Sequence, residues 1–481
     1  MNIITKGDQY KRGGISVPDL IWEKVNETSV REDVDDPFYI CDLQDILAKY
    51  RRWIKLLPNV EPFYAVKCNS EPQVLQLLAK LGVGFDCASK PEIQAMKDLD
   101  VDSSKIIFAN PCKQRSHLRY AAKHNLLFMT FDNEAELDKV KEVCPEQRLV
   151  LRILTDDSTA QCQLGLKFGC HPKKARFLLE QAKTLGLNVI GVSFHVGSGC
   201  RDASAYFKAI KSAREVMDQG IQIGYKMEVL DIGGGFPGQE SVALKFNEVA
   251  KVIKEALEVH FPETDKVRII AEPGRYFVAS AFTLAVNVTA VRVVARDCQT
   301  FKVPQSEDLV ANSEAPTKCE EPGYMYYVND GVYGSFNCIL YDHATVYPKL
   351  LKERAENHQE FSSSIWGPSC DGFDRIIEHI LLPKINVGEW IYFEDMGAYT
   401  MCAGSEFNGY LKPKCFYIND PIKKSGCYER TKASWEECIQ KECNSSPHYK
   451  KRSRGMDTKM VQPSYKSTSP GFPTLEVGKY V

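Results

Sequence analysis

The chain has 481 residues, of which 44% are hydrophobic. This length exceeds that of one compact core and predicts two domains. Its 61 basic and 63 acidic residues nearly balance, which argues against nucleic acid as a partner, and we expect no membrane contact because no run of about 18 apolar residues occurs.

Short apolar runs bounded by turn signals recur through the first half of the chain and alternate with helical patterns. Eight runs with seven intervening helices indicate a parallel sheet, and eight strands are the number that closes a (β/α)8 barrel. We therefore expect a barrel over residues 44–275. The runs occupy residues 62–66, 83–87, 105–109, 127–131, 149–153, 189–194, 227–232 and 267–272.

Polar or small residues stand at the end of these runs. Catalytic side chains of a barrel lie on the loops at the C-terminal ends of its strands. Each residue alone has a plain explanation, such as a solvated charge or a satisfied core histidine, but their joint position on one rim predicts a site. They are Lys67, Asp86, Asn110, Asp132, Arg152, His195, Gly233 to Gly235, Glu272 and Arg275.

The remainder of the chain has a different pattern. Residues 276–420 are rich in aromatic and β-branched types and predict an antiparallel β domain, which a strand in the N-terminal segment 1–43 would join. We expect residues 297–322 to be a mobile surface loop and 421–481 to be a largely disordered basic tail.

The 17 cysteines are odd in number and scattered. No paired Cys or His motif suggests a zinc site, so we expect no metal and read the cysteines as reduced thiols of a cytoplasmic protein. The N-terminal stretch has no apolar core of signal-peptide length, which agrees with that expectation.

Three rim segments indicate a phosphate site. Barrels commonly bind phosphate with the loops after strands seven and eight. The segment "DIGGGFPG" lets backbone N–H groups approach a phosphate, Arg275 of "AEPGR" offers a bidentate contact, and Ser198 of "FHVGSGC" offers a hydroxyl. Together with Lys67 and the Glu272 carboxylate, this arrangement indicates pyridoxal 5'-phosphate.

Several motifs resemble the eukaryotic ornithine decarboxylase family over roughly residues 30–410. They include "PFYAVKCNS", "SFHVGSGC", "LDIGGGFPG", "IAEPGRYF", "YYVNDGVYGSF" and "WGPSCDG". The resemblance implies a TIM-type barrel with an alanine-racemase-like β domain (fold type III). It also implies pyridoxal phosphate, conversion of L-ornithine to putrescine and carbon dioxide, and a homodimer with two shared active sites.

The resemblance also implies roles position by position. Lys67 matches the Schiff-base lysine, His195 the histidine that stacks on the ring, and Cys370 the acid that protonates the substrate Cα. In the family, the groups matched by Cys370, Asp371, Tyr341 and Asp342 reach in from the partner subunit. The residues that match cofactor contacts are Lys67, Asp86, His195, Ser198, Gly235, Glu272, Pro273, Gly274, Arg275 and Tyr399; those that match substrate contacts are Tyr341, Asp342, Asp371 and Phe407.

Two alternatives stay open. Some relatives are non-catalytic antizyme inhibitors, and residues 113–138 resemble the strip that binds antizyme in the family. The substrate could also be lysine or another amino acid, since one methylene changes discrimination only modestly. Three positions depart from the family pattern. The pattern predicts a basic residue at Gln163, in a loop mobile over the site, and the other two are Gly404 and Glu406 near Phe407.

Overall fold

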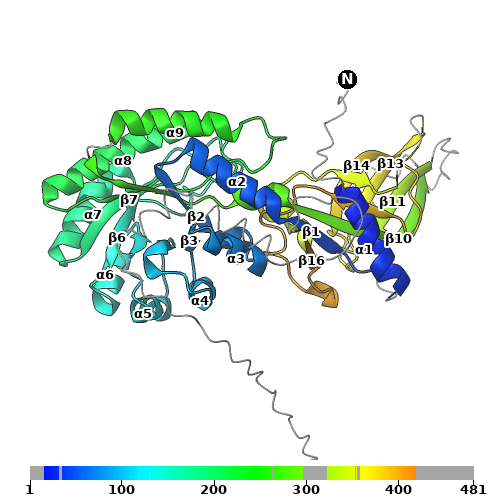
Figure 1. Ribbon diagram of the computed structural model, residues 1–481, viewed down its shortest axis with the longest axis horizontal. Coiled ribbons are helices and arrows are strands. Elements are labelled where there is room, and N and C mark those ends of the chain that lie inside the picture. The colour runs from blue at the N-terminus through cyan, green and yellow to red at the C-terminus, as the bar shows by residue number, and fades with distance from the viewer. Residues whose placement is uncertain are drawn as a thin grey trace, which may run out of the picture.

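A computed structural model describes residues 16–31, 35–126, 128–262, 265–295, 322–352, 354 and 358–418. Figure 1 shows a barrel surrounded by helices and a separate β-rich lobe beside it. The predicted surface loop, except Pro322, and the predicted tail lie outside the described residues.

The first lobe is a closed barrel of eight parallel strands in chain order, and β2 pairs with β9 to close it. The predicted (β/α)8 fold is therefore confirmed. The barrel interior is filled by large apolar side chains, among them Phe63, Ile107 and Ile190. The strands are β2 (Val60–Ala65), β3 (Gly84–Cys87), β4 (Ile106–Phe108), β5 (Phe128–Phe131), β6 (Arg148–Arg152), β7 (Asn188–Ser193), β8 (Val229–Asp231) and β9 (Arg268–Ala271).

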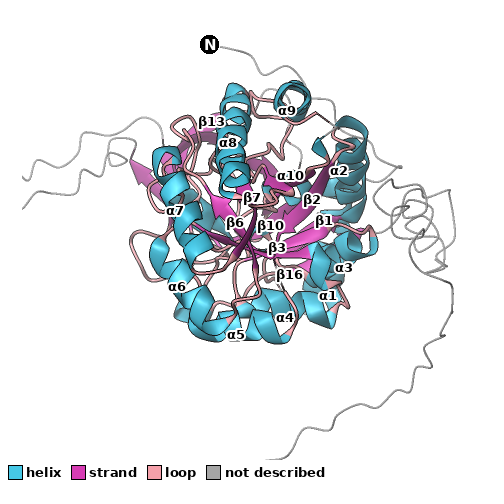
Figure 2. Ribbon diagram, turned by 90° about the vertical axis from the view of Figure 1, so that its left-hand side faces the viewer, coloured by secondary structure: helices cyan, strands magenta, loops and turns pink. Residues whose placement is uncertain are grey.

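Helices surround the barrel strands as an outer ring (Figure 2). Each presents an apolar face to the sheet; in α3, for example, Val74, Leu75, Leu77 and Leu78 are buried. No helix within the described ranges is long and apolar enough to cross a membrane. The ring consists of α2 (Leu43–Leu56), α3 (Pro72–Lys80), α4 (Lys90–Asp98), α5 (Arg115–Lys123), α6 (Glu134–Val143), α7 (Pro172–Thr184), α8 (Ser204–Ile223) and α9 (Phe246–His260).

The second lobe is an eight-stranded sheet built around the long strand β10 (Phe282–Ala295). As expected, a strand from the N-terminal segment joins it: β1 (Phe38–Asp42) pairs with β10. The sheet is mixed rather than antiparallel throughout, because β1 pairs in parallel with β16 and β11 in parallel with β13. The other strands are β11 (Pro322–Val328), β12 (Pro348–Leu350), β13 (Glu360–Trp366), β14 (Arg375–Pro383), β15 (Trp390–Phe393) and β16 (Lys414–Ile418).

Short helices join the lobes or cover the sheet. The helix α1 (Val17–Arg31) was not predicted; its Ile21 and Val25 pack against Phe38 and Trp390 of the sheet. Two single-turn helices, α10 (Arg275–Val278) and α11 (Cys338–Tyr341), begin or end at predicted site residues. The domain boundaries at residues 43, 275 and 420 remain predictions.

Candidate active site

The end of β2 places Lys67 at the mouth of the barrel, within the 3-10 turn η1 (Val66–Cys68). The Lys67 Nζ forms an ion pair with Asp86 of β3, whose side chain is fully buried. Burial opposes the charge on Lys67, but Asp86 and then Glu272 outweigh it and raise the pKa of Lys67 above its ordinary value. The lysine is therefore held as an ammonium in this arrangement.

Most of the residues expected to bind a cofactor meet around one cavity at this mouth. The barrel closure explains the convergence, because the ends of parallel strands lie on one rim. Asp86 and Pro273 do not line the cavity themselves. Asp86 accepts a hydrogen bond from the lining residue Lys67, and the Pro273 carbonyl accepts the N–H of the lining residue Ala65 at 3.2 Å. The cavity is lined by Ala65, Lys67, His195, Ser198, Gly199, Gly234, Gly235, Phe236, Glu272, Gly274, Arg275 and Tyr399.

Two glycines let the backbone pass close to this cavity. A Cβ on Gly234 would lie 2.7 Å from the His195 Nε2 atom, and one on Gly235 would lie 2.7 Å from the Gly197 carbonyl oxygen. Gly235 also has a φ of +97°, which favours glycine. The segment after β8 therefore requires glycine and presents backbone rather than side chains there.

Arg275 forms the most extensive polar contact of the cavity. Its guanidinium donates to the two carboxylate oxygens of Asp342 at 2.8 and 2.7 Å and to the Ser198 Oγ at 2.9 Å. It also lies over the Tyr399 ring, 5.1 Å from the centroid. Asp342 thus contacts the barrel-mouth arginine of its own chain; its expected role in a partner's site stays a prediction.

Three buried carboxyl groups, Glu272, Asp231 and Asp86, interact with one another next to Lys67. Burial, followed by the charges of Asp231 and Asp86, raises the pKa of Glu272 well above its usual range. Burial likewise raises the pKa of Asp231 to about 7, although its Oδ1 accepts the Gly233 N–H at 2.9 Å. Asp231 is not among the predicted site residues, because it lies inside the apolar run 227–232; an acidic residue within such a run was the available signal.

The surroundings of His195 disfavour its charged form. Its Nδ1 accepts the Gly197 N–H at 3.0 Å. Burial, and then the charges of Arg152 and Lys67, lower the pKa of His195 well below its ordinary value. A neutral imidazole suits contact with a ring better than proton transfer near neutral pH.

A second cluster of expected site residues lies in the β domain. The Tyr333 hydroxyl donates to the Asp371 Oδ2, and the Tyr333 and Phe407 rings lie 4.3 Å apart. The Cys370 N–H donates to the Asn408 Oδ1 at 3.0 Å. Tyr333 is not among the predicted site residues; its place between two glycines in "NDGVYGSF" was the available signal.

The structure does not bring these two clusters together within one chain. Cys370, Asp371, Phe407 and the 73% exposed Tyr341 do not line the barrel-mouth cavity. Gln163 is exposed, and its side-chain amide donates to the Ser158 carbonyl of its own loop at 3.3 Å. Gly404 packs against Gly334, which places it beside the second cluster.

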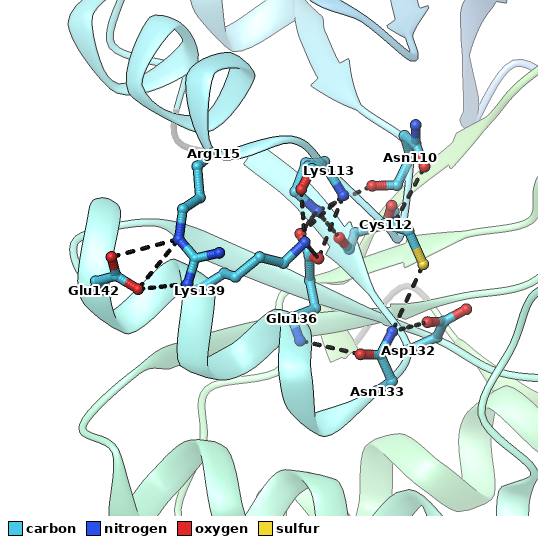
Figure 3. A network of polar contacts seen from close by, with 10 residues as sticks. Asn110, Cys112, Lys113, Arg115, Asp132, Asn133, Glu136, Lys139 and Glu142 are labelled. Atoms are coloured by element: carbon cyan, nitrogen blue, oxygen red, sulfur yellow. Dashed lines mark hydrogen bonds and ion pairs between the residues drawn. The ribbon is translucent and has the colours of Figure 1, made fainter.

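The strip of residues 113–138 spans α5, β5 and the start of α6, and Figure 3 shows the polar network that fixes it. Lys113 is buried, with its Nζ 2.9 Å from the Glu136 Oε1 and 3.0 Å from the Asn110 carbonyl oxygen. Lys139 contacts the other Glu136 oxygen at 2.5 Å. Arg119 and Lys123 are exposed on α5.

Comparison with known proteins identifies the family of this chain. Residues 43–279 match the family model described as pyridoxal-dependent decarboxylase, pyridoxal binding domain. The chain is 52% identical over 405 residues to ornithine decarboxylase of Mus musculus, covering 84% of this chain and 85% of that protein. It is 51% identical over 404 residues to antizyme inhibitor 2 of Xenopus laevis, again covering 84% and 85%.

Solved structures give the same result for the fold. The arginine decarboxylase of Paramecium bursaria Chlorella virus aligns with a TM-score of 0.74 and 34% identity, over 83% of this chain and 100% of that one. The lysine/ornithine decarboxylase of Vibrio vulnificus in complex with cadaverine aligns with a TM-score of 0.70 and 29% identity, over 84% and 100%. These neighbours share one fold but differ in the amino acid that their names give.

Proposed function

Since this chain belongs to the ornithine decarboxylase family of pyridoxal-dependent proteins, we propose that it converts L-ornithine to putrescine and carbon dioxide. The observation that supports this proposal is the cavity at the barrel mouth. It combines a lysine, a buried carboxyl group and an arginine–serine pair, which are the groups that pyridoxal phosphate chemistry requires.

The residues of the cavity fit that cofactor. The Glu272 Oε1 is buried and has no hydrogen-bond partner among the described residues, so it is available to a polar ring atom. The glycine segment after β8 leaves backbone groups close to the cavity. Lys67 would bind the aldehyde and Glu272 the ring nitrogen, while the ring face would lie on His195 and the phosphate on Ser198, Gly235, Arg275 and Tyr399.

The chain's own side chains would perform the remaining work. When bound, pyridoxal phosphate draws the electrons of the broken Cα–carboxylate bond into its ring. Burial raises the pKa of the Glu272 carboxyl group, which would favour sharing of a proton with the ring nitrogen. Cys370 would give a proton to the substrate Cα after carbon dioxide leaves.

Selection for a basic amino acid would come from carboxylates. Asp342 lies beside Arg275 at the cavity, and Asp371 lies with Tyr333 in the second cluster. Acceptors fixed at a set depth favour a substrate that ends in an ammonium group and disfavour apolar analogues, which would leave them unpaired.

We propose that the complete site forms in a homodimer. Cys370 and Asp371 lie outside the cavity of their own chain, so a second copy is needed to bring them to Lys67. Large apolar side chains are exposed near the predicted site residues: Leu166 is 90% exposed and Phe373 84%. A second copy that covers them would explain this exposure.

The proposed reaction is tested by release of labelled carbon dioxide from L-ornithine, L-lysine, L-arginine and L-leucine, with pyridoxal phosphate supplied. Release mainly from ornithine supports the proposal. Release mainly from another amino acid would support the decarboxylation reaction but overturn ornithine as the substrate. Release from none overturns the decarboxylase assignment.

Antizyme binding is a second candidate function, because a relative of comparable identity is named an antizyme inhibitor. The strip 113–138 exposes Arg119 and Lys123 over a rigid base formed by Lys113 and Glu136. Charge reversal at both exposed positions should weaken binding to purified antizyme more than reversal of the exposed Lys254 on α9. Equal antizyme binding by the wild type, the Arg119/Lys123 variant and the Lys254 variant would show that the strip is not the antizyme-binding site.

A further inference from the structure

The loop between β6 and α7 is fixed to the segment that carries Ser198. Cys162 and Ser198 exchange both backbone hydrogen bonds, each at 3.0 Å, and the Gln161 N–H donates to the Gly199 carbonyl at 3.1 Å. The Asp157 Oδ2 accepts the Leu164 N–H at 2.5 Å within the same loop. In this structure the loop is therefore joined by backbone hydrogen bonds to the segment that carries Ser198.

The tip of this loop contacts Asp342, which is 181 residues away in sequence from Gln161. The Gln161 Nε2 donates to the Asp342 backbone carbonyl. The Cys162 Sγ lies 3.5 Å from the Asp342 Oδ1 and 3.8 Å from the same carbonyl oxygen. Burial and Asp342 raise the pKa of Cys162 to about 11, so its thiol keeps its proton and acts as the donor.

These contacts complete the backbone support of Asp342. Its N–H donates to the Cys338 carbonyl at 3.0 Å, at the end of α11. The helix end thus holds the amide side of the residue, and Gln161 holds the carbonyl side. Asp342 itself is only 5% exposed, whereas the preceding Tyr341 is 73% exposed. The loop from the barrel therefore contributes to where the Asp342 carboxylate lies.

We infer that Gln161 and Cys162 are positioning residues that fix the depth of Asp342 and thereby set which substrate side-chain length the site accepts. This inference rests on the proposed function, in which Asp342 accepts the terminal ammonium group. Ornithine and lysine differ by one methylene, and such a difference is worth roughly 10- to 200-fold in selectivity when the receiving groups are fixed. Loosening Asp342 would let the longer substrate enter.

The chain offers a matched pair of variants. Gln161→Met keeps the side-chain length and removes the donor to Asp342. Gln163→Met makes the same change two residues away, where the amide is exposed and bonds only within its own loop. The kcat and KM of both variants would be measured with L-ornithine and with L-lysine, with cofactor absorbance as a check of loading.

Gln161→Met should lower the ratio of kcat/KM for ornithine over lysine about tenfold, chiefly through KM, and leave cofactor absorbance unchanged. Gln163→Met should keep the wild-type ratio. A wild-type ratio in Gln161→Met, or an equal change in both variants, would overturn the inference. If Gln161→Met does not fold, Gln161→Asn, which shortens the donor arm by one methylene, gives the same reading.

A binding measurement separates this inference from the proposed reaction. Dissociation constants of 1,4-diaminobutane and 1,5-diaminopentane would be measured by calorimetry on the cofactor-loaded protein and on both variants. If the protein binds the diamines but releases no carbon dioxide, the proposed reaction fails, and the ratio of the two constants still tests Gln161. If it binds neither diamine, Asp342 is no ammonium site and the inference fails.

Discussion

Arg275 donates to both carboxylate oxygens of Asp342, at 2.8 and 2.7 Å, and so joins the end of the barrel to the β domain at the cavity. Both side chains are largely buried, with 15% and 6% of their surfaces exposed. Arg275 also contacts Ser198, so the guanidinium that should hold a phosphate already has an anionic partner. A phosphate bound there must share Arg275 with Asp342.

Asp342→Asn should therefore change stability in a way that depends on phosphate. The variant loses the charge that partners a largely buried guanidinium, and we expect the free energy of unfolding to fall by about 2 kcal/mol in a phosphate-free buffer. Inorganic phosphate should then stabilise Asp342→Asn more than the wild type, because it can replace the lost anion. Urea unfolding with and without phosphate measures both effects.

Asp371→Asn is the control for this experiment. Asp371 is also expected to bind substrate, but its carboxylate accepts from the Tyr333 hydroxyl and the Phe373 N–H and pairs with no arginine in the described part of the chain. Its response to phosphate should match that of the wild type. A phosphate response of Asp342→Asn no larger than that of the control would show that Asp342 does not compete for Arg275.

His195 gives a prediction about pH. The pKa of His195 is lower in the folded protein than its ordinary value near 6.5. At pH values between these two pKa values, the unfolded chain therefore binds more protons than the folded protein. Stability should consequently fall as the pH drops below 6.5. His195→Asn removes this contribution, and between pH 7.5 and 5.5 it should lose up to about 1 kcal/mol less stability than the wild type.

Denaturant unfolding at the two pH values tests this prediction. The raised pKa values of Glu272 and Asp231 act in the opposite direction, since those groups release protons late as the pH rises. They remain in the variant, so the difference between variant and wild type reports on His195. Equal losses in the two proteins would mean that His195 is not held neutral.

The strand pattern predicts which residues lie near the barrel mouth for a physical reason, although Asn110, Asp132 and Arg152 do not line its cavity. Parallel strands that close into a barrel must bring their C-terminal ends to one rim, so Lys67, His195 and Arg275 can be placed together from the strand pattern alone. Contacts between loops have no such rule. The contact of Gln161 with Asp342 and the pairing of Asp342 with Arg275 depend on how the β domain docks, which local patterns do not encode.

The strand pairing of the β domain likewise could not be predicted from local sequence patterns. Aromatic and β-branched runs predict strands but not their partners, because side-chain alternation is the same in parallel and antiparallel pairs. The pairing of β1 with both β10 and β16 brings three distant segments of the chain together. The helix α1 was missed although its Ile21 and Val25 lie on one face, since a single short amphipathic stretch is a weak signal.

Lys113 should matter more to stability than its exposed neighbour Arg115. The Lys113 side chain is buried and satisfies Glu136, the Asn110 carbonyl and the Thr130 carbonyl, whereas Arg115 pairs with Glu142 in solvent. Lys113→Met removes the buried donor to the two carbonyl oxygens and leaves Glu136 with Lys139 as its remaining lysine partner, so it should lower the free energy of unfolding by about 3 kcal/mol. Arg115→Met should have no measurable effect. Comparable losses in the two variants would contradict this account of the strip.

Mixing two inactive variants tests whether sites are shared between subunits. Lys67→Ala removes the residue at the barrel mouth, and Cys370→Ala removes the proposed acid of the second cluster; each protein alone should be inactive. In an equal mixture about half of the dimers are mixed, and each mixed dimer contains one site with both residues if the site spans two chains. Release of carbon dioxide should then recover to roughly a quarter of the wild-type rate. If each site were instead completed within a single subunit, every site in the mixture would lack either Lys67 or Cys370, and no activity would be recovered. Lys67 and Cys370 lie in separate clusters of one chain, which is why we expect the shared arrangement. Mixing Lys67→Ala with the double variant Lys67→Ala/Cys370→Ala must also give none, since neither protein supplies the lysine.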